Sequence, residues 1–543
     1  MGFQISIRSA TLFATLCLFV LIGFALLPQA GIEDDEALNV SGVYAHGFIA
    51  HAVEIFGLRI PIMLMSYYGA LKSWIYAPIF EFWTPSPTSL RTPVILAGGF
   101  TLWLFYRLLL RIAGYPAATI GCLLLSVDPI FLLTTCFDWG PVVLQHLLTV
   151  SGVLCLVRFY QESRRRFLAV GFFLFGLALW DKALFAWILS GMAISVLFIF
   201  PKELRKLLSV RNVAVAMLAF CLGAGPLIFY NVCFPLNTFH SNATYSTDHL
   251  PEKTRNLVSA LNGSALFGYL ARTDPGERPR NPRGTIEQVS VRTTEIVGHF
   301  RSGFFGYALL AALLLTPWLW STRARRPILF SIVTMLVAWL QMFFTKGAGA
   351  SAHHVILLWP FPTLVVAVAF AEASSMLGRA GKPLLVVVLL ILVGTSALVT
   401  NEYFASLVRN GGGLVWTDAI YPLSDFLKRV NSKVIYVNDW GMFGTLLMLG
   451  EGNLPLRGGS DPLSKPHLDM VDKRVVLDRI SERGAVFVGH SDGNELFKGV
   501  NANLRALAAE AGYRREILAE LADRNGRGIF EVFRYAPSAD CCK

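Results

Sequence analysis

Residues 10–28 read ATLFATLCLFVLIGFALLP and are followed, after QAGI, by four consecutive acids, Glu33-Asp34-Asp35-Glu36. The apolar stretch carries no charge and is long enough to cross roughly 30 Å of hydrocarbon as an α-helix rising about 1.5 Å per residue. Its length and its acidic exit do not fit a cleaved signal peptide. The stretch therefore predicts a membrane span that ends in a cluster of carboxylates.

Ten further apolar blocks follow the first one, and 54% of the 543 residues are hydrophobic while only 15% are charged. Soluble domains carry about 25% charged residues. The composition therefore excludes a soluble enzyme, a disordered scaffold and a secreted disulfide domain, and predicts a polytopic α-helical membrane protein with about 11 transmembrane helices. The predicted spans lie near residues 10–28, 93–112, 116–134, 141–159, 167–180, 183–200, 212–231, 302–320, 328–345, 355–373 and 383–400.

The net charge of +11 does not indicate a nucleic acid partner. Lys and Arg cluster in alternate short connections between the apolar blocks, where a basic excess marks the cytoplasmic side. This pattern predicts a multi-pass protein of the cytoplasmic (inner) membrane with a cytoplasmic amino terminus. With an odd number of spans, the carboxyl terminus lies outside.

Three segments are then external: 31–92, 232–301 and 401–543. The first is rich in aromatic residues between Leu58 and Trp83, which favours helices lying in the membrane interface. The division places a membrane module at 1–400 and a periplasmic or extracellular domain at 401–543.

The external tail has the pattern of a small α/β domain that closes its own core. Short β-branched runs at 433–438 and 484–489 predict buried strands, and Asn525-Gly526 predicts a hairpin. Helical periodicity occupies 418–430 and 495–512. Gly411-Gly412-Gly413 is interpreted as a flexible linker. No phosphate-cradling glycine loop is present, so no nucleotide cofactor is expected.

Candidate chemistry gathers at the predicted external ends of the spans. The acidic cluster is either a solvated loop or a source of a general base or metal ligand. Asp138 is either a helix cap, as Pro141 suggests, or a second acid facing that cluster. Lys182 either pairs with Asp181 or receives a phosphate.

A fourth candidate site is the stretch from Lys346 to His353-His354, which enters a span containing Pro360 and Pro362. The two adjacent histidines are expected to point to different helix faces, one toward the interior and one toward the interface. The prolines favour an opened helix and a cavity beneath them. Together the four sites predict a pocket for an anionic substrate embedded in the membrane.

These residues resemble a known family. The chain resembles the GT-C superfamily in five features. They are the Asp-Glu dipeptide after the first span, the interfacial segment, the acid before the fourth span, the Lys between spans five and six and the His motif. The chain is most similar to the bacterial relatives of protein O-mannosyltransferases and lipid A aminoarabinose transferases. Residues 66–78 and 88–93, with His353-His354 through Pro360, carry this resemblance, which covers about 1–400.

The resemblance implies a glycosyltransferase that moves a hexosyl or pentosyl group, with inversion, from a polyprenyl-phosphate donor to a lipid, glycan or protein acceptor. Asp35 would be the general base, supported by Glu36, and Asp138 would be the second acid. A divalent cation (Mg, Mn or Zn) would bind at Asp35 and Asp138. The donor phosphate would meet the cations and imidazoles of Lys72, Lys182, Lys346, His353 and His354. Many relatives carry an acid where Lys72 stands, and Asp34 is expected to remain solvated.

Two other functions fit parts of the pattern. A transporter or flippase of a lipid-linked or anionic envelope substrate would carry acids near the bilayer midplane and repeated halves. An envelope-assembly protein would use the external tail for binding and the helices as anchors. The nearly charge-free spans, the lack of a repeat and the polar external ends favour the transferase, with membrane lipids and the lipid-linked sugar as partners.

Overall fold

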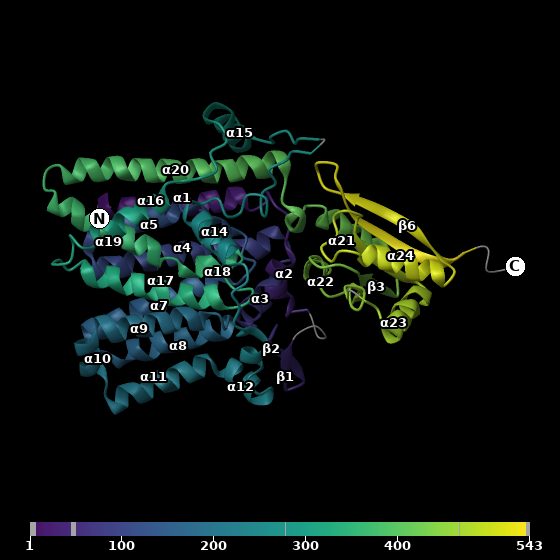
Figure 1. The fold of residues 1–543 in the computed structure, drawn as a ribbon, viewed down its shortest axis with the longest axis horizontal. Coiled ribbons are helices and arrows are strands. Elements are labelled where there is room, and N and C mark those ends of the chain that lie inside the picture. The colour runs from purple at the N-terminus through teal and green to yellow at the C-terminus, as the bar shows by residue number, and fades with distance from the viewer. Residues whose placement is uncertain (1–6, 45–49, 277, 466, 539–543) are drawn as a thin grey trace.

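The computed structural model describes residues 7–44, 50–276, 278–465 and 467–538. Long helices run side by side along the longest dimension of the molecule, and a smaller lobe built around a sheet lies beyond one end of them (Figure 1). The two chain termini lie at opposite ends of this long axis. This arrangement confirms a mostly helical protein with a small carboxyl-terminal α/β unit.

The membrane module is made of helices joined by short turns and two longer external segments. Its helices are α1 (Ile7–Leu26), α2 (Asp34–Ser41), α3 (Leu71–Phe82), α4 (Pro87–Ile112), α5 (Gly114–Ser126), α6 (Pro129–Cys136), α7 (Val142–Glu162), α8 (Arg165–Asp181), α9 (Phe185–Ile199), α10 (Pro201–Leu207), α11 (Val210–Gly223), α12 (Gly225–Cys233), α13 (Asn237–Asn242), α14 (Leu250–Leu261), α15 (Thr285–Val297), α16 (Phe305–Leu315), α17 (Arg325–Phe344), α18 (Ala352–Val355), η1 (Ile356–Leu358), α19 (Phe361–Met376) and α20 (Gly381–Asn410).

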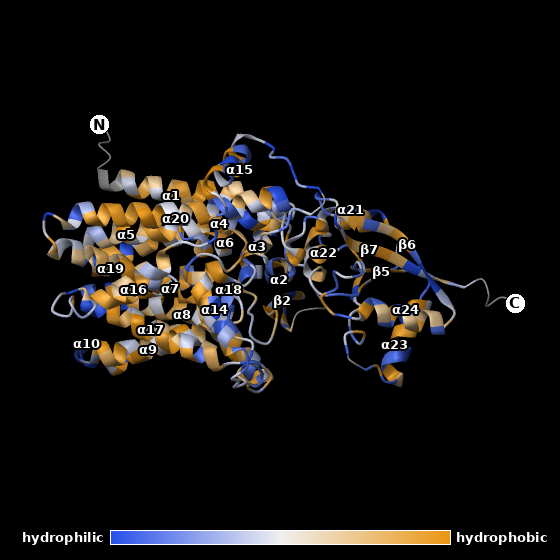
Figure 2. Cartoon of the chain, turned by 45° about the horizontal axis from the view of Figure 1, so that its top comes forward, coloured by the Kyte–Doolittle hydropathy of each residue, from blue (hydrophilic) through white to orange (hydrophobic). Residues whose placement is uncertain are grey.

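Each of the eleven predicted blocks coincides with one helix or with a bent pair of helices. Within the described residues, four helices (α4, α7, α17 and α20) are long and apolar enough to cross a membrane, and the total reaches eight if each bent pair counts as one span. The first and eighth blocks form shorter apolar helices. Figure 2 shows mostly hydrophobic residues along the helices of the bundle and more hydrophilic residues around α2, α14 and α15, toward the sheet-bearing lobe. The total of eleven spans stays a prediction.

The bent pairs have a common local cause. In all four pairs, α5 with α6, α9 with α10, α11 with α12, and α18–η1 with α19, the second helix has a proline in its first turn. Proline has no backbone N–H and its ring clashes with the preceding turn, so it fits the first turn of a helix and favours a break before it, although Pro78 and Pro93 lie inside α3 and α4. The bends are 59°, 102°, 69° and 41° respectively.

The segment between α1 and α4, predicted to be external, contains more than the predicted interfacial helices. Besides α3, it forms an antiparallel hairpin of β1 (His51–Ile55) and β2 (Leu58–Met63). Phe56 and Gly57 make the turn with φ of 52° and 79°. The sequence analysis missed this hairpin because phenylalanine is unusual at a position with positive φ.

The tail forms a five-stranded mixed sheet with the order β4-β3-β5-β7-β6. β3 is parallel to β4 and β5, and β7 is antiparallel to β5 and β6. The predicted strands and the hairpin at Asn525-Gly526 are confirmed. The elements are η2 (Leu414–Trp416), α21 (Ile420–Arg429), β3 (Val434–Val437), α22 (Phe443–Leu449), β4 (Leu456–Gly458), α23 (Met470–Ser481), β5 (Ala485–His490), α24 (Val500–Glu510), β6 (Tyr513–Ala522) and β7 (Gly528–Pro537).

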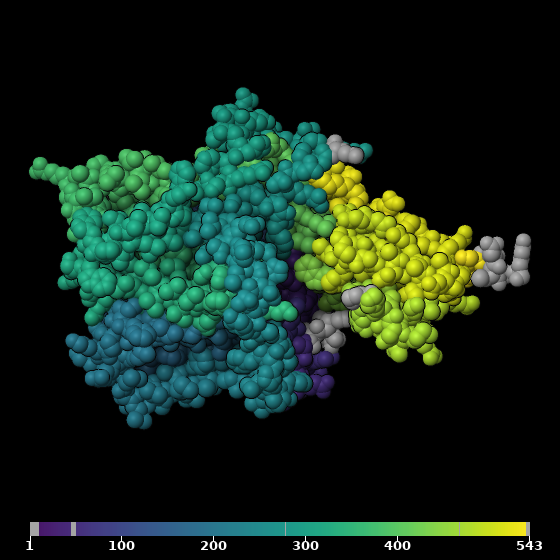
Figure 3. All heavy atoms as spheres, viewed as in Figure 1, coloured from purple at the N-terminus to yellow at the C-terminus, as the bar shows by residue number. Residues whose placement is uncertain are grey.

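The tail closes a core of its own on one face of its sheet, where Val476 of α23 and Leu504 of α24 pack against Phe487 and Phe533, but the other face is not closed by the tail alone. That face shares a buried cluster with the membrane module, in which Val40 on α2 and Tyr76 on α3 pack with Leu446 and Val488 of the tail. The space-filling view shows the amino-terminal segment wedged between the helical body and the tail (Figure 3). The tail is therefore an integral part of the fold at this junction.

The connection into the tail is also rigid. The predicted boundary at 400/401 lies inside α20, which continues to Asn410. Gly412 pairs with Ala271, and a Cβ on Gly413 would lie only 1.8 Å from the carbonyl oxygen of Tyr269. The three glycines thus allow a close backbone crossing and are not a flexible linker, which corrects the interpretation of their sequence.

We expect cysteine labelling to place the tail and the basic turn before α8 on opposite sides of the membrane. Exposed Lys498 and Arg164 are suitable positions, because Val500 nearby is buried. In a background without native cysteines, an impermeant thiol reagent added to intact cells should label Lys498→Cys. It should label Arg164→Cys only after the cells are opened. Labelling of both in intact cells would contradict the orientation.

Candidate functional site

The four acids after α1 lie at the amino-terminal turn of α2, and three of them have fixed partners. Glu33 caps the helix by accepting a hydrogen bond from the backbone N–H of Glu36 at 3.1 Å. Asp34 accepts hydrogen bonds from the N–H groups of Gly444 (2.6 Å) and Thr445 (3.3 Å) at the start of α22. Asp34 is thus buried against the tail, and the expectation that it stays solvated is wrong.

Glu36 is held by Arg91 of α4. Both of its carboxylate oxygens accept hydrogen bonds from the guanidinium, each at 2.8 Å, and neither side chain is more than 1% exposed. The same guanidinium donates to the carbonyl oxygens of Leu27, Ala30 and Gly31. Glu36 therefore supports the site by fixing the backbone between α1 and α2 and has no free oxygen for a substrate.

Asp35 is the remaining acid of the cluster. Its side chain is half-buried, and none of the described residues donates a hydrogen bond to its carboxylate. Burial and the neighbouring charge of Asp34 raise its pKa from 3.8 to about 7, while the ammonium of Lys182 acts in the opposite direction. The arrangement leaves one carboxylate with proton affinity in the neutral range at the end of the bundle that faces the tail.

Asp138 lies in the buried turn between α6 and α7 and has two partners. Its Oδ1 accepts the N–H of Val143, so the capping interpretation describes part of its role. Its Oδ2 lies 3.1 Å from the ammonium of Lys72 on α3, which also donates to the Asp138 carbonyl. The second predicted acid is thus neutralised by the cation that the sequence analysis assigned to the donor side.

Lys182, which caps the carboxyl end of α8, approaches the same turn from the other side. Its ammonium donates to the carbonyl oxygen of Gly140 at 3.0 Å, and the side chain is fully buried. Asp181 is not its hydrogen-bond partner, because Asp181 accepts from Gln145 of α7 at 2.8 Å. Burial lowers the pKa of Lys182 to about 8, although Asp181, Asp138 and Asp35 raise it.

The two histidines stand together and do not point to different faces, which corrects the expectation from their adjacency. Their ring centroids lie 4.2 Å apart. The indole N–H of Trp139 donates to Nδ1 of His353 at 2.9 Å, and Ser351 Oγ lies 2.8 Å from the same nitrogen. Indole can only donate, so Nδ1 accepts and Nε2 of His353 carries the proton.

Gly140 allows this approach. A Cβ at Gly140 would lie 2.9–3.2 Å from the His353 side chain. The turn that holds Asp138 therefore also receives Lys182 through a carbonyl and His353 through a ring contact. The fold brings five of the predicted residues to one region of the molecule, and His354 lies beside them. The five are Asp35, Asp138, Lys72, Lys182 and His353.

Lys346 lies apart from this group. Its side chain is exposed in the loop after α17, and its backbone N–H donates to Thr244. Beside this loop is an open groove of about 430 Å3 between α9 and α17, lined by Trp187, Ala243, Tyr245, Leu340, Gln341, Phe344 and Thr345. Lys346 stands at the rim of a largely apolar groove and not at the acidic turn.

The predicted metal ligands do not form a metal centre. Throughout the part of the chain that is described, no three His, Cys, Asp or Glu side chains converge as a cation site would require. Both oxygens of Asp138 are engaged, one by Val143 and one by Lys72. A divalent ion at Asp35 and Asp138 would have to displace the Lys72 ammonium, so the donor set does not fit a resident metal.

The sequence analysis assigned no role to three residues that build the site: Arg91, Trp139 and Gln145. Arg91 had a visible signal, because it is a charge within the first turns of a long apolar helix, where a buried partner is required. Trp139 and Gln145 flank Asp138 in sequence but give no pattern of their own. Their contacts depend on how α7 packs against α8 and α18.

Comparison with known proteins shows which family model and which solved structures this chain resembles. Residues 69–229, from the hairpin to α12, match the family model described as dolichyl-phosphate-mannose-protein mannosyltransferase. The structure of ArnT from Cupriavidus metallidurans bound to undecaprenyl phosphate superposes with a TM-score of 0.56 and 13% identity, covering 96% of this chain and 97% of that one. The chain has the GT-C fold.

Two other solved structures have a similar overall fold. ArnT in the apo state gives a TM-score of 0.55 at 14% identity, covering 97% of this chain and 98% of that chain. The oligosaccharyltransferase of Archaeoglobus fulgidus in complex with Zn and sulfate gives 0.53 at 12% identity, covering 96% of this chain and 73% of that chain. No curated protein matches the sequence at a significant level. The predicted GT-C superfamily resemblance is confirmed at the level of the fold.

We expect Asp34→Ala to destabilise the protein through its junction with the tail. The substitution leaves the N–H groups of Gly444 and Thr445 buried without an acceptor, and hydrogen bonds to charged groups contribute about 1.5–3 kcal/mol each. Thermal unfolding of the purified full-length protein should show a lower midpoint than wild type. Asp425→Ala, on the exposed side of α21, is the control and should leave the midpoint unchanged. Equal midpoints for all three proteins would contradict the role of Asp34.

Proposed function

We propose that this protein transfers a hexosyl or pentosyl group from a polyprenyl-phosphate-linked donor to an acceptor hydroxyl at the outer face of the cytoplasmic membrane, with inversion. The acceptor would be a lipid, a glycan or a protein. The match to the mannosyltransferase family model and the fold shared with an undecaprenyl-phosphate-bound ArnT support this class of chemistry. The observation that carries the proposal is the state of Asp35.

Asp35 is suited to act as the general base. Glu33, Asp34 and Glu36 are committed to a helix cap, to the tail and to Arg91, whereas Asp35 is only partly buried and its carboxylate accepts no hydrogen bond from the described residues. Its raised pKa of about 7 means that it can hold a proton taken from an acceptor hydroxyl near neutral pH. A general base works best when its pKa lies near the operating pH.

The reaction follows from this arrangement in one displacement. Asp35 takes the proton from the acceptor hydroxyl while the hydroxyl oxygen forms a bond to the anomeric carbon. The bond from that carbon to the phosphate oxygen breaks on the opposite face, so the configuration inverts and the lipid phosphate leaves with the electron pair. Lys182 and the Nε2–H of His353 would stabilise the negative charge that develops on the phosphate. Asp138, in the turn between α6 and α7, holds the ammonium of Lys72 on α3.

The surroundings provide places for a lipid donor. The groove beside α9 and α17 is open and is lined mostly by apolar and aromatic side chains. An isoprenoid chain in this groove would leave its phosphate near the external end of α17, where Lys346 is exposed. Lys346 would thus attract the headgroup during entry, while Lys182 acts at the reacting phosphate.

One observation bears on the transporter alternative. Asp128 is an acid buried in the break between α5 and α6, the position at which transporters bind ions or substrates. Its Oδ1 accepts the N–H of Phe131 at 2.8 Å and its Oδ2 accepts the indole N–H of Trp359 at 3.0 Å. Because both oxygens are used to join two helix breaks, Asp128 is better explained as a structural link.

We expect Asp35→Asn to lower turnover by about two to four orders of magnitude, because the amide keeps the size of the carboxylate but cannot accept the proton. In the wild type, kcat/KM for transfer from a polyprenyl-phosphate sugar should rise with pH and level off above about pH 7. This rise should be absent in the variant. Glu54→Gln, on the exposed hairpin, is the control and should keep wild-type rates. Wild-type turnover by Asp35→Asn would reject the assignment.

Asp35→Asn should also change how the stability of the protein depends on pH, in favour of the variant at higher pH. The folded protein binds the Asp35 proton more tightly than the unfolded chain, since the pKa rises from 3.8 to about 7 on folding. Ionisation therefore destabilises the fold as the pH increases through this interval. Relative to wild type, the melting temperature of Asp35→Asn should be higher at about pH 8 than at about pH 5. A variant that only damages the fold would be less stable at both values.

We expect Lys182→Met to weaken donor binding. The substitution removes the ammonium but keeps the unbranched chain, so the affinity for polyprenyl phosphate should fall by about tenfold or more, as expected for the loss of one charge-assisted contact. Lys465→Met is the control for the loss of a lysine ammonium, because Lys465 pairs with Asp472 in the tail and does not border the proposed donor groove. Binding of polyprenyl phosphate to protein in detergent should separate the two. Equal losses would indicate that Lys182 makes no specific contact with the donor phosphate.

A further inference from the structure

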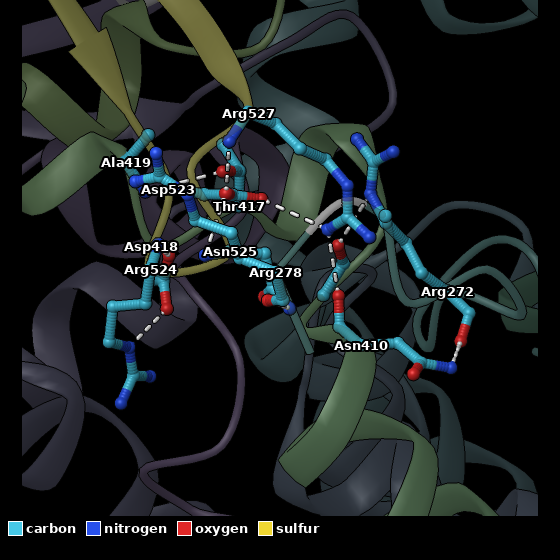
Figure 4. A network of polar contacts seen from close by, with 12 residues as sticks. Arg272, Arg278, Asn410, Thr417, Asp418, Ala419, Asp523, Arg524, Asn525 and Arg527 are labelled. Atoms are coloured by element: carbon cyan, nitrogen blue, oxygen red, sulfur yellow. Dashed lines mark hydrogen bonds and ion pairs between the residues drawn. The ribbon is translucent and has the colours of Figure 1, made fainter. Parts of the chain in front are cut away.

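A cluster of arginines lies where the second external segment meets the tail, away from the acidic turn. It combines side chains from three parts of the chain: the segment after Ala271, the end of α20 and the turn between β6 and β7 (Figure 4). The arginines are Arg272, Arg278, Arg280, Arg409, Arg524 and Arg527. The acids described among them are Asp274, Asp418 and Asp523, and Glu277 lies outside the described residues.

Asn525 brings these segments together. Its side-chain amide donates to the carbonyl oxygens of Pro275 (3.3 Å), Arg278 (3.0 Å) and Arg409 (2.9 Å). Asn525 is 1% exposed, so the backbone of all three segments converges on a buried point. The arginines lie on these segments around Asn525, and the side chains of Arg278 and Arg524 are exposed.

Only part of the positive charge is neutralised. Asp418 pairs with Arg280 at 2.8 Å and also with Arg524, and Asp523 pairs with Arg527 at 3.1 Å. Across the described ranges, Arg272, Arg278 and Arg409 form no ion pair with a carboxylate. The Nε atoms of Arg280 and Arg409 are buried and have no acceptor among the described residues.

Arg272 has no carboxylate partner among the described residues, and it lies beside Arg527, whose own charge is paired with Asp523. Both side chains extend into the same space above Asn410 (Figure 4). Arg272 donates through Nε to the carbonyl oxygen of Gly412 at 3.1 Å, whereas Arg527 is held by the carbonyls of Asn410 and Asp274. Burial and the charge of Arg527 lower the pKa of Arg272. Two half-buried guanidinium groups this close to each other favour a shared anion.

We propose that this junction is a binding site for a phosphate group, contacted by Arg272, Arg278 and Arg527. Removing like charges from water without a counterion costs free energy, and a bound anion offsets that cost. Guanidinium forks match the oxygens of a phosphate ester and donate two parallel hydrogen bonds to it. The ligand would be a phosphorylated envelope lipid or glycan, or free phosphate. The site is separate from Lys72 and Lys182, and the inference holds whether or not the proposed transfer is correct.

The test measures binding directly, without turnover. Inorganic pyrophosphate is titrated into the purified full-length protein by calorimetry, with chloride at the same ionic strength as the reference. Wild type should bind saturably, and Arg272→Gln combined with Arg278→Gln should lower the affinity by about tenfold or more. Arg505→Gln is the control, because Arg505 pairs with Asp492 elsewhere in the tail. Equal binding by all three proteins, or no binding beyond the chloride reference, would overturn the proposal.

Two further experiments complete the test. One distinguishes a lipid headgroup from free phosphate, and the other replaces the double variant if that variant does not fold. Phosphatidylcholine nanodiscs with and without phosphatidic acid test a lipid source. Protection of the junction from hydrogen exchange only with phosphatidic acid would assign the site to a lipid headgroup. If the double variant does not fold, Arg278→Gln alone is used, since its side chain is exposed. Unchanged pyrophosphate affinity and unchanged protection by phosphatidic acid in that variant would also reject the site.

Discussion

The organisation of the site depends on the guanidinium of Arg91. All five of its N–H groups are used, two by the oxygens of Glu36 and three by the carbonyls of Leu27, Ala30 and Gly31. The carbonyls belong to the stretch where α1 ends and α2 has not begun, so they have no helical partners. One buried cation therefore fixes the direction in which the acidic turn leaves the membrane and also neutralises one of its four charges. Removing either partner would leave an unpaired charge in the core, at a cost of about 3–5 kcal/mol.

This arrangement resolves a conflict in the sequence. Four adjacent carboxylates repel each other, and they can be buried together only if each has a partner or accepts a proton. A helix cap, the start of α22 and Arg91 provide partners for Glu33, Asp34 and Glu36. Asp35 has no such partner among the described residues, and its burial together with the charge of Asp34 raises its pKa. The reactivity proposed for Asp35 thus comes from the order imposed on its neighbours.

Much of the fold follows from local sequence patterns. Apolar blocks of helical length predict the positions of the helices, and Asn525-Gly526 predicts the hairpin of β6 and β7, because these signals act over a few residues. The hairpin that turns at Phe56 was missed, since phenylalanine is rarely found at a turn position with positive φ. The break at Asp128 was missed for a different reason, because a span of this composition looks continuous without its contact to Trp359.

The candidate site was predictable by residue type but not by pairing. The sequence analysis collected Asp35, Asp138, Lys72, Lys182 and His353 because acids and cations stood at predicted span ends. It could not show that Lys72 neutralises Asp138 or that Asp34 faces the tail. Those contacts join positions 66 and 410 residues apart. Such distances leave no local pattern, and only tertiary packing decides which charge meets which.

The contact between Asp34 and Gly444 also has a consequence for biogenesis. The acidic turn is synthesised before its partner, which follows 410 residues later. At about 5–20 residues per second, translation takes roughly 20–80 seconds to cover that interval. During this time, the carboxylate of Asp34 and the apolar side of α2 have no tail to pack against. A chain interrupted before α22 would therefore carry all of the residues proposed for catalysis and still lack the contact that holds Asp34 beside them.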